Sequence, residues 1–166
     1  MVLTVGLLSA ISGLFAVEQF MTTRDLMRTA PFIAHVRVID AHTVPGIAAL
    51  EYDLQLLEAL KGKLPARLRM RMFCGLRVVN PGGAEQPAGS EWIVFLGPGS
   101  GDLYPIRSLQ WGRIDVATNS ESGEQVLIKQ LSGLPAPASG AYHTLPEFRQ
   151  LVRGVLSGAI KPGTGR

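Results

Sequence analysis

The chain has 166 residues, of which 46% are hydrophobic and only 17% are charged. This composition excludes global disorder and suits one domain that is large enough to bury its own core. The net charge of +3 identifies no partner, and the only cysteine, Cys74, excludes an internal disulfide or a zinc site built from cysteines.

Residues 1–17 contain no charged side chain. An apolar run of this length is short for a membrane span but typical of the core of a secretory signal. No Lys or Arg precedes it, and the best small-residue cleavage site ends at Ala16. We therefore expect residues 1–20 to be a signal peptide or a membrane anchor, with a buried N-terminal helix as the alternative. The expected location is periplasmic or secreted.

A short helix and a first strand are predicted next. Thr22 or Thr23 can cap a helix that ends near Met27, since the residue before Pro31 avoids helical geometry. Residues 32–41 are rich in β-branched side chains and are expected to form a strand. The side chains expected inside are Phe32, Ala34, Val36 and Val38, and those expected outside are His35 and Arg37.

Residues 50–73 predict two facing antiparallel strands. Apolar and polar side chains alternate on either side of a Lys-Gly-Lys-Leu-Pro break, as in half-buried strands. One polar face is acidic and the other is basic, which favours pairing the two strands with each other. The expected inner side chains are Leu50, Tyr52, Leu54, Leu56, Leu68, Met70 and Met72. The expected outer ones include Glu51 and Asp53, which are interpreted as partners of Arg67, Arg69 and Arg71.

Residues 91–96 are almost all apolar, which indicates a central strand that is covered on both faces. The Gly-x-Gly-x-Gly that follows, at 97–101, has no helix behind it, so a hairpin turn is favoured over a phosphate loop. Further strand candidates are residues 103–106, 112–117 and 125–129.

The C-terminal region predicts a surface linker at 134–140 and then an amphipathic helix. Thr144 and Glu147 fit a capping box, and Gly158 is expected to end the helix. Its expected apolar face consists of Phe148, Leu151, Val152, Val155 and Leu156. The predicted fold class is mainly β: a β-barrel of five to six antiparallel strands over residues 21–133, with a short N-terminal helix. Residues 134–166 are expected to pack on the same domain.

The sequence contains no recognisable catalytic or metal motif. His35, His42 and His143 are the only histidines, and none has a metal-ligand spacing. His143 is instead expected to pack over the entry to the last helix. No serine lies in a Gly-x-Ser-x-Gly elbow. The sequence therefore predicts no catalytic residue, no metal site and no cofactor.

Several short motifs occur in an order that resembles a known family. They are the segment 24–31 before FIAHVRV, the Leu-Lys-Gly corner at 60–62, GSEWIVFL at 89–96 and QWGRI at 110–114. Together they resemble uncharacterised exported bacterial proteins that are similar to tissue inhibitors of metalloproteinases and netrin modules. The resemblance covers about residues 22–128 and implies a five-stranded OB-fold barrel. Those inhibitors chelate zinc through an N-terminal cysteine, which this chain lacks, so no inhibitory residue is carried over.

The expected function is that of a non-enzymatic exported OB-fold module that engages a protein partner, with a secreted peptidase as one candidate. Its contact surface is expected to include the N-terminal segment and the loop at 79–89. The candidate surface residues are Arg67, Arg69, Arg71, Arg77 and Asn80.

Three other functions stay open. The chief alternative is a nucleic-acid-binding OB domain that uses Arg67, Arg69 and Arg71, although this basic face lacks aromatic side chains for base stacking. The others are an enzyme of unrecognised type and a structural subunit of an envelope assembly. A membrane partner is expected only if the N-terminal segment stays uncleaved.

Overall fold

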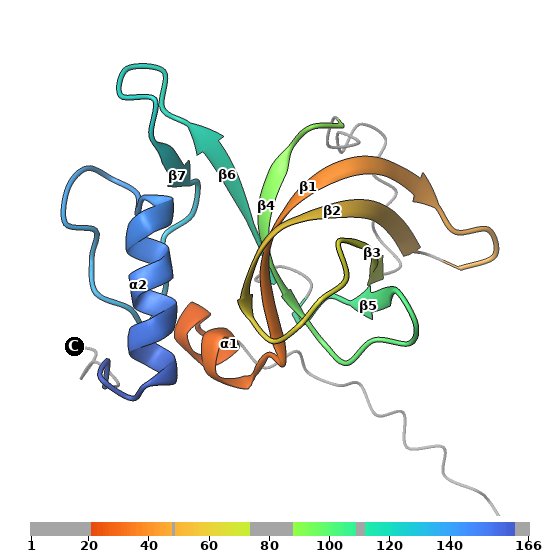
Figure 1. Cartoon of the computed structure of the whole chain (residues 1–166), viewed down its shortest axis with the longest axis horizontal. Helices are drawn as coiled ribbons and strands as arrows, with labels where there is room; N and C mark the ends of the chain where they lie inside the picture. The colour runs from red at the N-terminus through yellow and green to blue at the C-terminus, as the bar shows by residue number, and fades with distance from the viewer. Residues whose placement is uncertain (1–20, 48, 74–87, 109–111, 162–166) are drawn as a thin grey trace, which may run out of the picture.

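The computed structural model describes residues 21–47, 49–73, 88–108 and 112–161 (Figure 1). The predicted signal or anchor, Cys74, and the residues after 161 lie outside these ranges. The elements are α1 Thr23–Thr29, β1 Phe32–Thr43, β2 Ala49–Lys61, β3 Arg67–Phe73, β4 Glu91–Leu96, β5 Leu103–Pro105, β6 Arg113–Thr118, β7 Gln125–Leu127 and α2 Leu145–Leu156. In the described residues, no helix is both long and apolar enough to cross a membrane.

The described strands form one mixed sheet that is not closed, in the order β5-β3-β2-β1-β4-β6-β7. The mainly β prediction is confirmed, but the prediction of five to six antiparallel strands is wrong. The sheet in the described residues has seven strands, and β3 and β5 are parallel, because both run opposite to β4, which lies between them in the sequence. An isolated antiparallel bridge also joins Leu96, at the end of β4, to Ile106, just after β5.

The predicted pairing of β2 with β3, and the predicted inner and outer sides of their residues, are confirmed. Leu54 lies opposite Leu68, and Tyr52 lies opposite Met70, with their side chains on the inner face of the curved sheet. The exposed fraction of Leu54 is 1%, whereas Gln55 is exposed on the other face. Alternation along this strand therefore placed each of these side chains on the correct side.

A first hydrophobic core fills the inside of the curve. Tyr52 and Trp92 meet there edge to face, with ring centroids 5.0 Å apart. Such aromatic pairs add to the stabilisation that comes from burying their area. The buried members are Ala34, Val36, Val38, Tyr52, Leu54, Leu68, Met70, Trp92, Val94, Leu96 and Tyr104.

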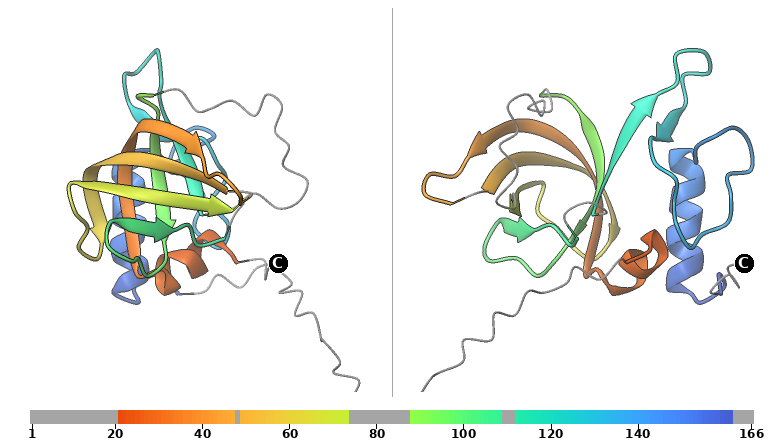
Figure 2. Two further views of the ribbon diagram at one scale, coloured as in Figure 1. Left: turned by 90° about the vertical axis from the view of Figure 1, so that its right-hand side faces the viewer. Right: turned by 180° about the vertical axis from the view of Figure 1, so that it is seen from behind.

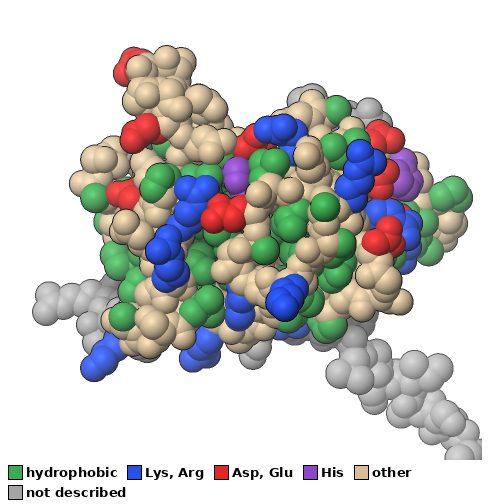
Figure 3. Space-filling model, viewed as in Figure 1, with side chains coloured by type: hydrophobic (Ala, Val, Ile, Leu, Met, Phe, Trp, Pro, Cys, Tyr) green, Lys and Arg blue, Asp and Glu red, His purple; other side chains and the backbone are tan. Residues whose placement is uncertain are grey.

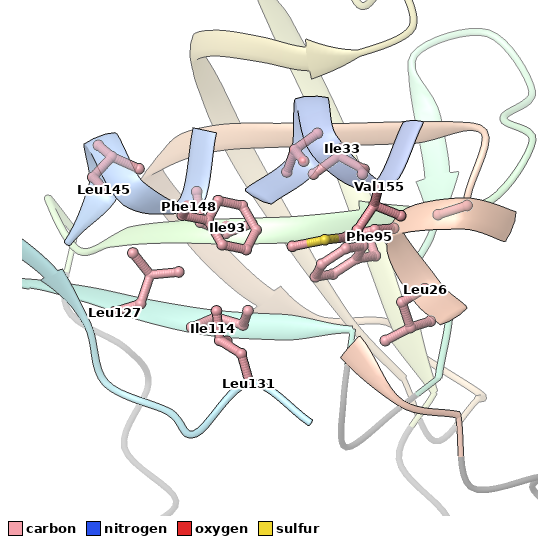
Figure 4. Close-up of a cluster of buried hydrophobic side chains, with 13 residues drawn as sticks. Leu26, Ile33, Ile93, Phe95, Ile114, Leu127, Leu131, Leu145, Phe148 and Val155 are labelled. Atoms are coloured by element: carbon pink, nitrogen blue, oxygen red, sulfur yellow. The ribbon is translucent and has the colours of Figure 1, made fainter. Parts of the chain in front are cut away.

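A second core lies between the opposite face of the sheet and the two helices, which pack on the same side of the strands (Figures 1 and 2). Figure 4 shows Phe148 and Val155 of α2 packed with Ile93 and Phe95 of β4. Since Trp92 and the alternate residues of β4 point into the first core, this strand is buried on both faces, as predicted.

The helix ends follow from local side-chain hydrogen bonds. Thr22 caps α1 by accepting a hydrogen bond from the amide of Asp25 at 3.1 Å. The predicted capping box of α2 is confirmed: Thr144 accepts from the Glu147 amide at 3.3 Å, and the Glu147 carboxylate accepts from the Thr144 amide at 2.8 Å. Leu156 was wrongly assigned to the buried face: it is 44% exposed, because it is the last residue of the helix.

Candidate functional site

The candidate surface residues of β3 do lie together. Arg67, Arg69 and Arg71 project from one face of the strand and lie opposite Gln55, Asp53 and Glu51 of β2. We call this surface the polar face; its other members are Asp40 and His42 of β1 and Asp102 before β5. Basic, acidic and histidine side chains intermingle at this end of the molecule, on the right in Figure 3. The other two candidates, Arg77 and Asn80, lie outside the described residues, as does most of the loop at 79–89.

Glu51 is the buried centre of the polar face. Its carboxylate accepts a 2.8 Å hydrogen bond from Nε of Arg71, a second from Nη2 of that residue, and one of 3.3 Å from Nη1 of Arg69. His42 Nε2 lies 3.7 Å from the same carboxylate. The hydrogen bonds from Arg71 are the main reason that the pKa of Glu51 is below its usual value, and burial opposes them.

The burial of Glu51 corrects a prediction. The sequence pattern placed it on a solvated face, but its exposed fraction is only 4%. Long arginine side chains cover surface with their apolar stems while they keep their charged groups near water. Arg69 and Arg71 flank the carboxylate in this way, so a residue on the outer side of the sheet becomes inaccessible.

Arg69 also binds the turn before β5. Its Nε and Nη2 atoms lie 3.2 and 3.0 Å from the two carboxylate oxygens of Asp102, which is a bidentate pair. This pairing raises the pKa of Arg69 and lowers that of Asp102. Arg67, by contrast, is exposed and forms no ion pair within the described part of the chain.

A second polar cluster surrounds Glu91, the first residue of β4. This strand pairs with β1 along the edge opposite to β2. His35 Nε2 lies 2.9 Å from one carboxylate oxygen, and the Gln125 amide donates to the same oxygen at 2.7 Å. Arg37 donates to the other oxygen at 2.7 Å. Burial lowers the pKa of His35, against the opposing influence of the Glu91 charge.

His35 lies on the predicted outer face of β1, but its burial was not predicted. Its exposed fraction is only 5%. The reason is that helices and β7 form a second layer over the strands, which alternation within β1 does not reveal. The sequence pattern did not predict Glu91 as the hydrogen-bond partner of His35. The available signal was the single carboxylate at the start of an otherwise apolar strand.

His143 is buried beside the start of α2. It is 5% exposed, its Nε2 lies 3.0 Å from the carbonyl oxygen of Pro135, and its own carbonyl accepts from the amide of Leu127. The prediction that it packs over the helix entry is confirmed.

No protein-family model matches the chain, and no curated protein matches it. The resemblance to metalloproteinase inhibitors and netrin modules therefore stays a prediction.

Proposed function

We propose that this chain is a non-enzymatic, exported module with an OB-type barrel, and that its polar face binds a protein partner. The observation that carries the proposal is that two arginines of the polar face form ion pairs with carboxylates of the same chain. Arg69 and Arg71 are held by Glu51 and Asp102, so the face presents both signs of charge.

Mixed charge favours a protein over a nucleic acid as the partner. A phosphate backbone is bound by cations that are free to replace its counterions. The two paired arginines would have to leave carboxylates first, and the exposed Arg67 alone is a weak phosphate site. Protein interfaces, in contrast, use complementary charges of both signs to fix orientation and choice of partner.

The strand contacts support the barrel. β1 pairs with both β2 and β4, β2 pairs with β3, and β3 pairs with β5. The Leu96–Ile106 bridge then connects the β5 end to the β4 end, and Gly97 donates to Pro105 at 2.8 Å beside it. Five strands thus follow one another around a ring with one short junction, which suits a partly open OB-type barrel. The uncharged run at 1–17 supports export.

Site-specific photocrosslinking in the source cells tests this function. A photoreactive residue replaces Arg67 on the polar face, and a matched control replaces Arg153, which is exposed on α2. We expect one envelope protein to crosslink from position 67 and not from 153. Equal crosslinking from both positions, or recovery of the chain in the cytoplasmic fraction, would contradict the proposal.

A titration with single-stranded oligonucleotides separates the nucleic-acid alternative. We expect no binding, even at low ionic strength, where phosphate contacts are strongest. Binding that weakens steeply with salt and is lost in Arg67→Glu would favour the alternative instead.

A further inference from the structure

Three side chains that can bind metals meet on the polar face of the β1–β2 hairpin. They are Asp40 and His42 of β1 and Asp53 of β2, and one ligand atom from each lies within 4.8 Å of the other two. Asp40 lies directly opposite Asp53 in the strand register, and His42 follows two residues later on the same face. The group therefore combines one imidazole with two carboxylates on two paired strands.

A β-bulge at Ile39 brings Asp40 into this group. Val38 pairs with Leu54 and Asp40 pairs with Asp53, so β1 has one extra residue between these pairs. Val38 points into the inner core, and strict alternation would have turned Asp40 to that side as well. Bulges re-aim side chains in this way and are frequent beside functional sites.

The electrostatics of the pair favour a bound cation. Like charges directly opposite each other on paired strands are destabilising. Neither Asp40 nor Asp53 forms an ion pair in the described part of the chain. The arginine opposite Asp53 on β3, Arg69, is already bound by Glu51 and Asp102. Arg69 interacts electrostatically with Asp53, but its hydrogen bonds go to Glu51 and Asp102. Within the described residues, the two facing carboxylates are therefore not hydrogen bonded to a protein cation.

We propose that Asp40, His42 and Asp53 bind a divalent transition-metal ion of the Zn²⁺ class. One nitrogen and two oxygen donors suit Zn²⁺, whereas Ca²⁺ and Mg²⁺ prefer ligand sets made of oxygen alone. Donors in a tetrahedral zinc site lie about 3.3 Å apart. The Asp40 and His42 side chains can close the remaining gap by rotation, because both are exposed among the described residues.

Three protein ligands leave the fourth zinc position to water. The site lies beside Glu51, whose carboxylate is 3.7 Å from His42, but Glu51 is committed to two arginines. This inference does not depend on the protein partner proposed above, since the ligands all come from this chain.

Calorimetric titration of the untagged full chain with ZnCl₂, after treatment with EDTA, tests the site. We expect one Zn²⁺ per chain and a higher melting temperature with Zn²⁺, because the ligands meet only in the folded state. Parallel titrations use CaCl₂ and MgCl₂, which we expect to bind more weakly than Zn²⁺.

Single variants assign the ligands. His42→Ala and Asp53→Asn should each weaken Zn²⁺ binding by at least about ten-fold. Glu121→Gln, which removes an exposed carboxylate between β6 and β7, should leave Zn²⁺ binding unchanged. Circular dichroism should show unchanged folding, since the His42 side chain is 48% exposed.

Backbone amide spectra of the ¹⁵N-labelled chain locate the ion. Shifts on adding Zn²⁺ should concentrate near residues 40–42 and 53. The proposal is overturned if Zn²⁺ does not bind, if His42→Ala binds it as tightly as the original chain, or if Ca²⁺ binds as tightly as Zn²⁺.

Discussion

At the scale of single residues, two buried ionisable groups are held in opposite ways. Two arginines lower the pKa of Glu51 and so stabilise its carboxylate, while burial lowers the pKa of His35 and so favours its neutral form. A pKa that differs between the folded and unfolded states makes stability depend on pH. Substitution of either residue should therefore change how the stability of the folded chain depends on pH.

Glu51→Gln should lower the free energy of unfolding at pH 7 by about 1–3 kcal/mol, because hydrogen bonds to a charged acceptor are lost. The folded pKa of Glu51 lies below its usual 4.5. Its contribution is therefore complete above that value and is lost as the pH falls through the folded pKa. Urea unfolding at pH 7 and pH 3 should show the deficit shrink in acid. Glu124→Gln, at an exposed position, is the control and should show no deficit at either pH.

His35→Gln should flatten the pH dependence of stability on the acid side of neutrality. The folded pKa of His35 lies below its usual 6.5, so protonation favours the unfolded chain. The contribution of His35 is present above 6.5 and is lost as the pH falls through the folded pKa. Glutamine can still hydrogen bond to Glu91 but does not titrate. Melting temperatures of both proteins between pH 7.5 and about 5 measure the difference; parallel curves would contradict the assignment.

At the scale of elements, alternation and capping were readable from the sequence, whereas layers and bulges were not. Leu54 of β2 and Met70 of β3 were correctly placed because each of these strands has one apolar face. His35 was placed on the correct face, but its burial could not be predicted, because the elements that cover it are distant in the sequence. Asp40 and Asp53 meet through a bulge and a register that no local spacing encodes, so their association with His42 could not be predicted.

Leu54→Asp tests the register of β2. The side chain is 1% exposed, so a carboxylate there should cost about 4 kcal/mol or more and prevent stable folding. Gln55→Asp is the matched variant on the other face, between Arg37 and Arg67, and should change stability by less than about 0.5 kcal/mol. Thermal unfolding measures both; equal losses would contradict the register.

Thr144→Ala tests the capping box of α2. Loss of the hydroxyl acceptor should lower the free energy of unfolding by about 1 kcal/mol. Thr144→Ser, which keeps the hydroxyl, should restore most of it. Urea denaturation of the three proteins measures the difference, and an alanine variant as stable as the original chain would show that the cap is unimportant.

At the scale of the whole molecule, β4 connects the two cores. Trp92 and Phe95 project to opposite sides of the same short strand, so loosening either core removes support from the other. The predicted C-terminal helix is thus an integral layer of the sheet domain, with Phe148 fully buried beneath it.

Phe148→Ala should destabilise the whole domain by about 3–5 kcal/mol, through lost burial and a residual cavity. Because the cores share β4, circular dichroism and tryptophan fluorescence should report one transition that moves together to lower urea. Leu156→Ala is the control at an exposed position of the same helix and should have little effect. Separate transitions in the two signals would mean that the cores unfold independently.

Both terminal strands of the described sheet, β5 and β7, are covered by other parts of the chain. The free side of β7 is occupied by the Val126–Thr144 bridge and the hydrogen bond from Leu127 to His143, and the β5 end is joined to β4 through Ile106. An extended peptide that adds itself to a sheet needs an open row of amides and carbonyls. At these terminal strands that row is already taken by the chain itself. Addition of a peptide strand at β5 or β7, and fibre-like stacking of copies through these two strands, are therefore disfavoured.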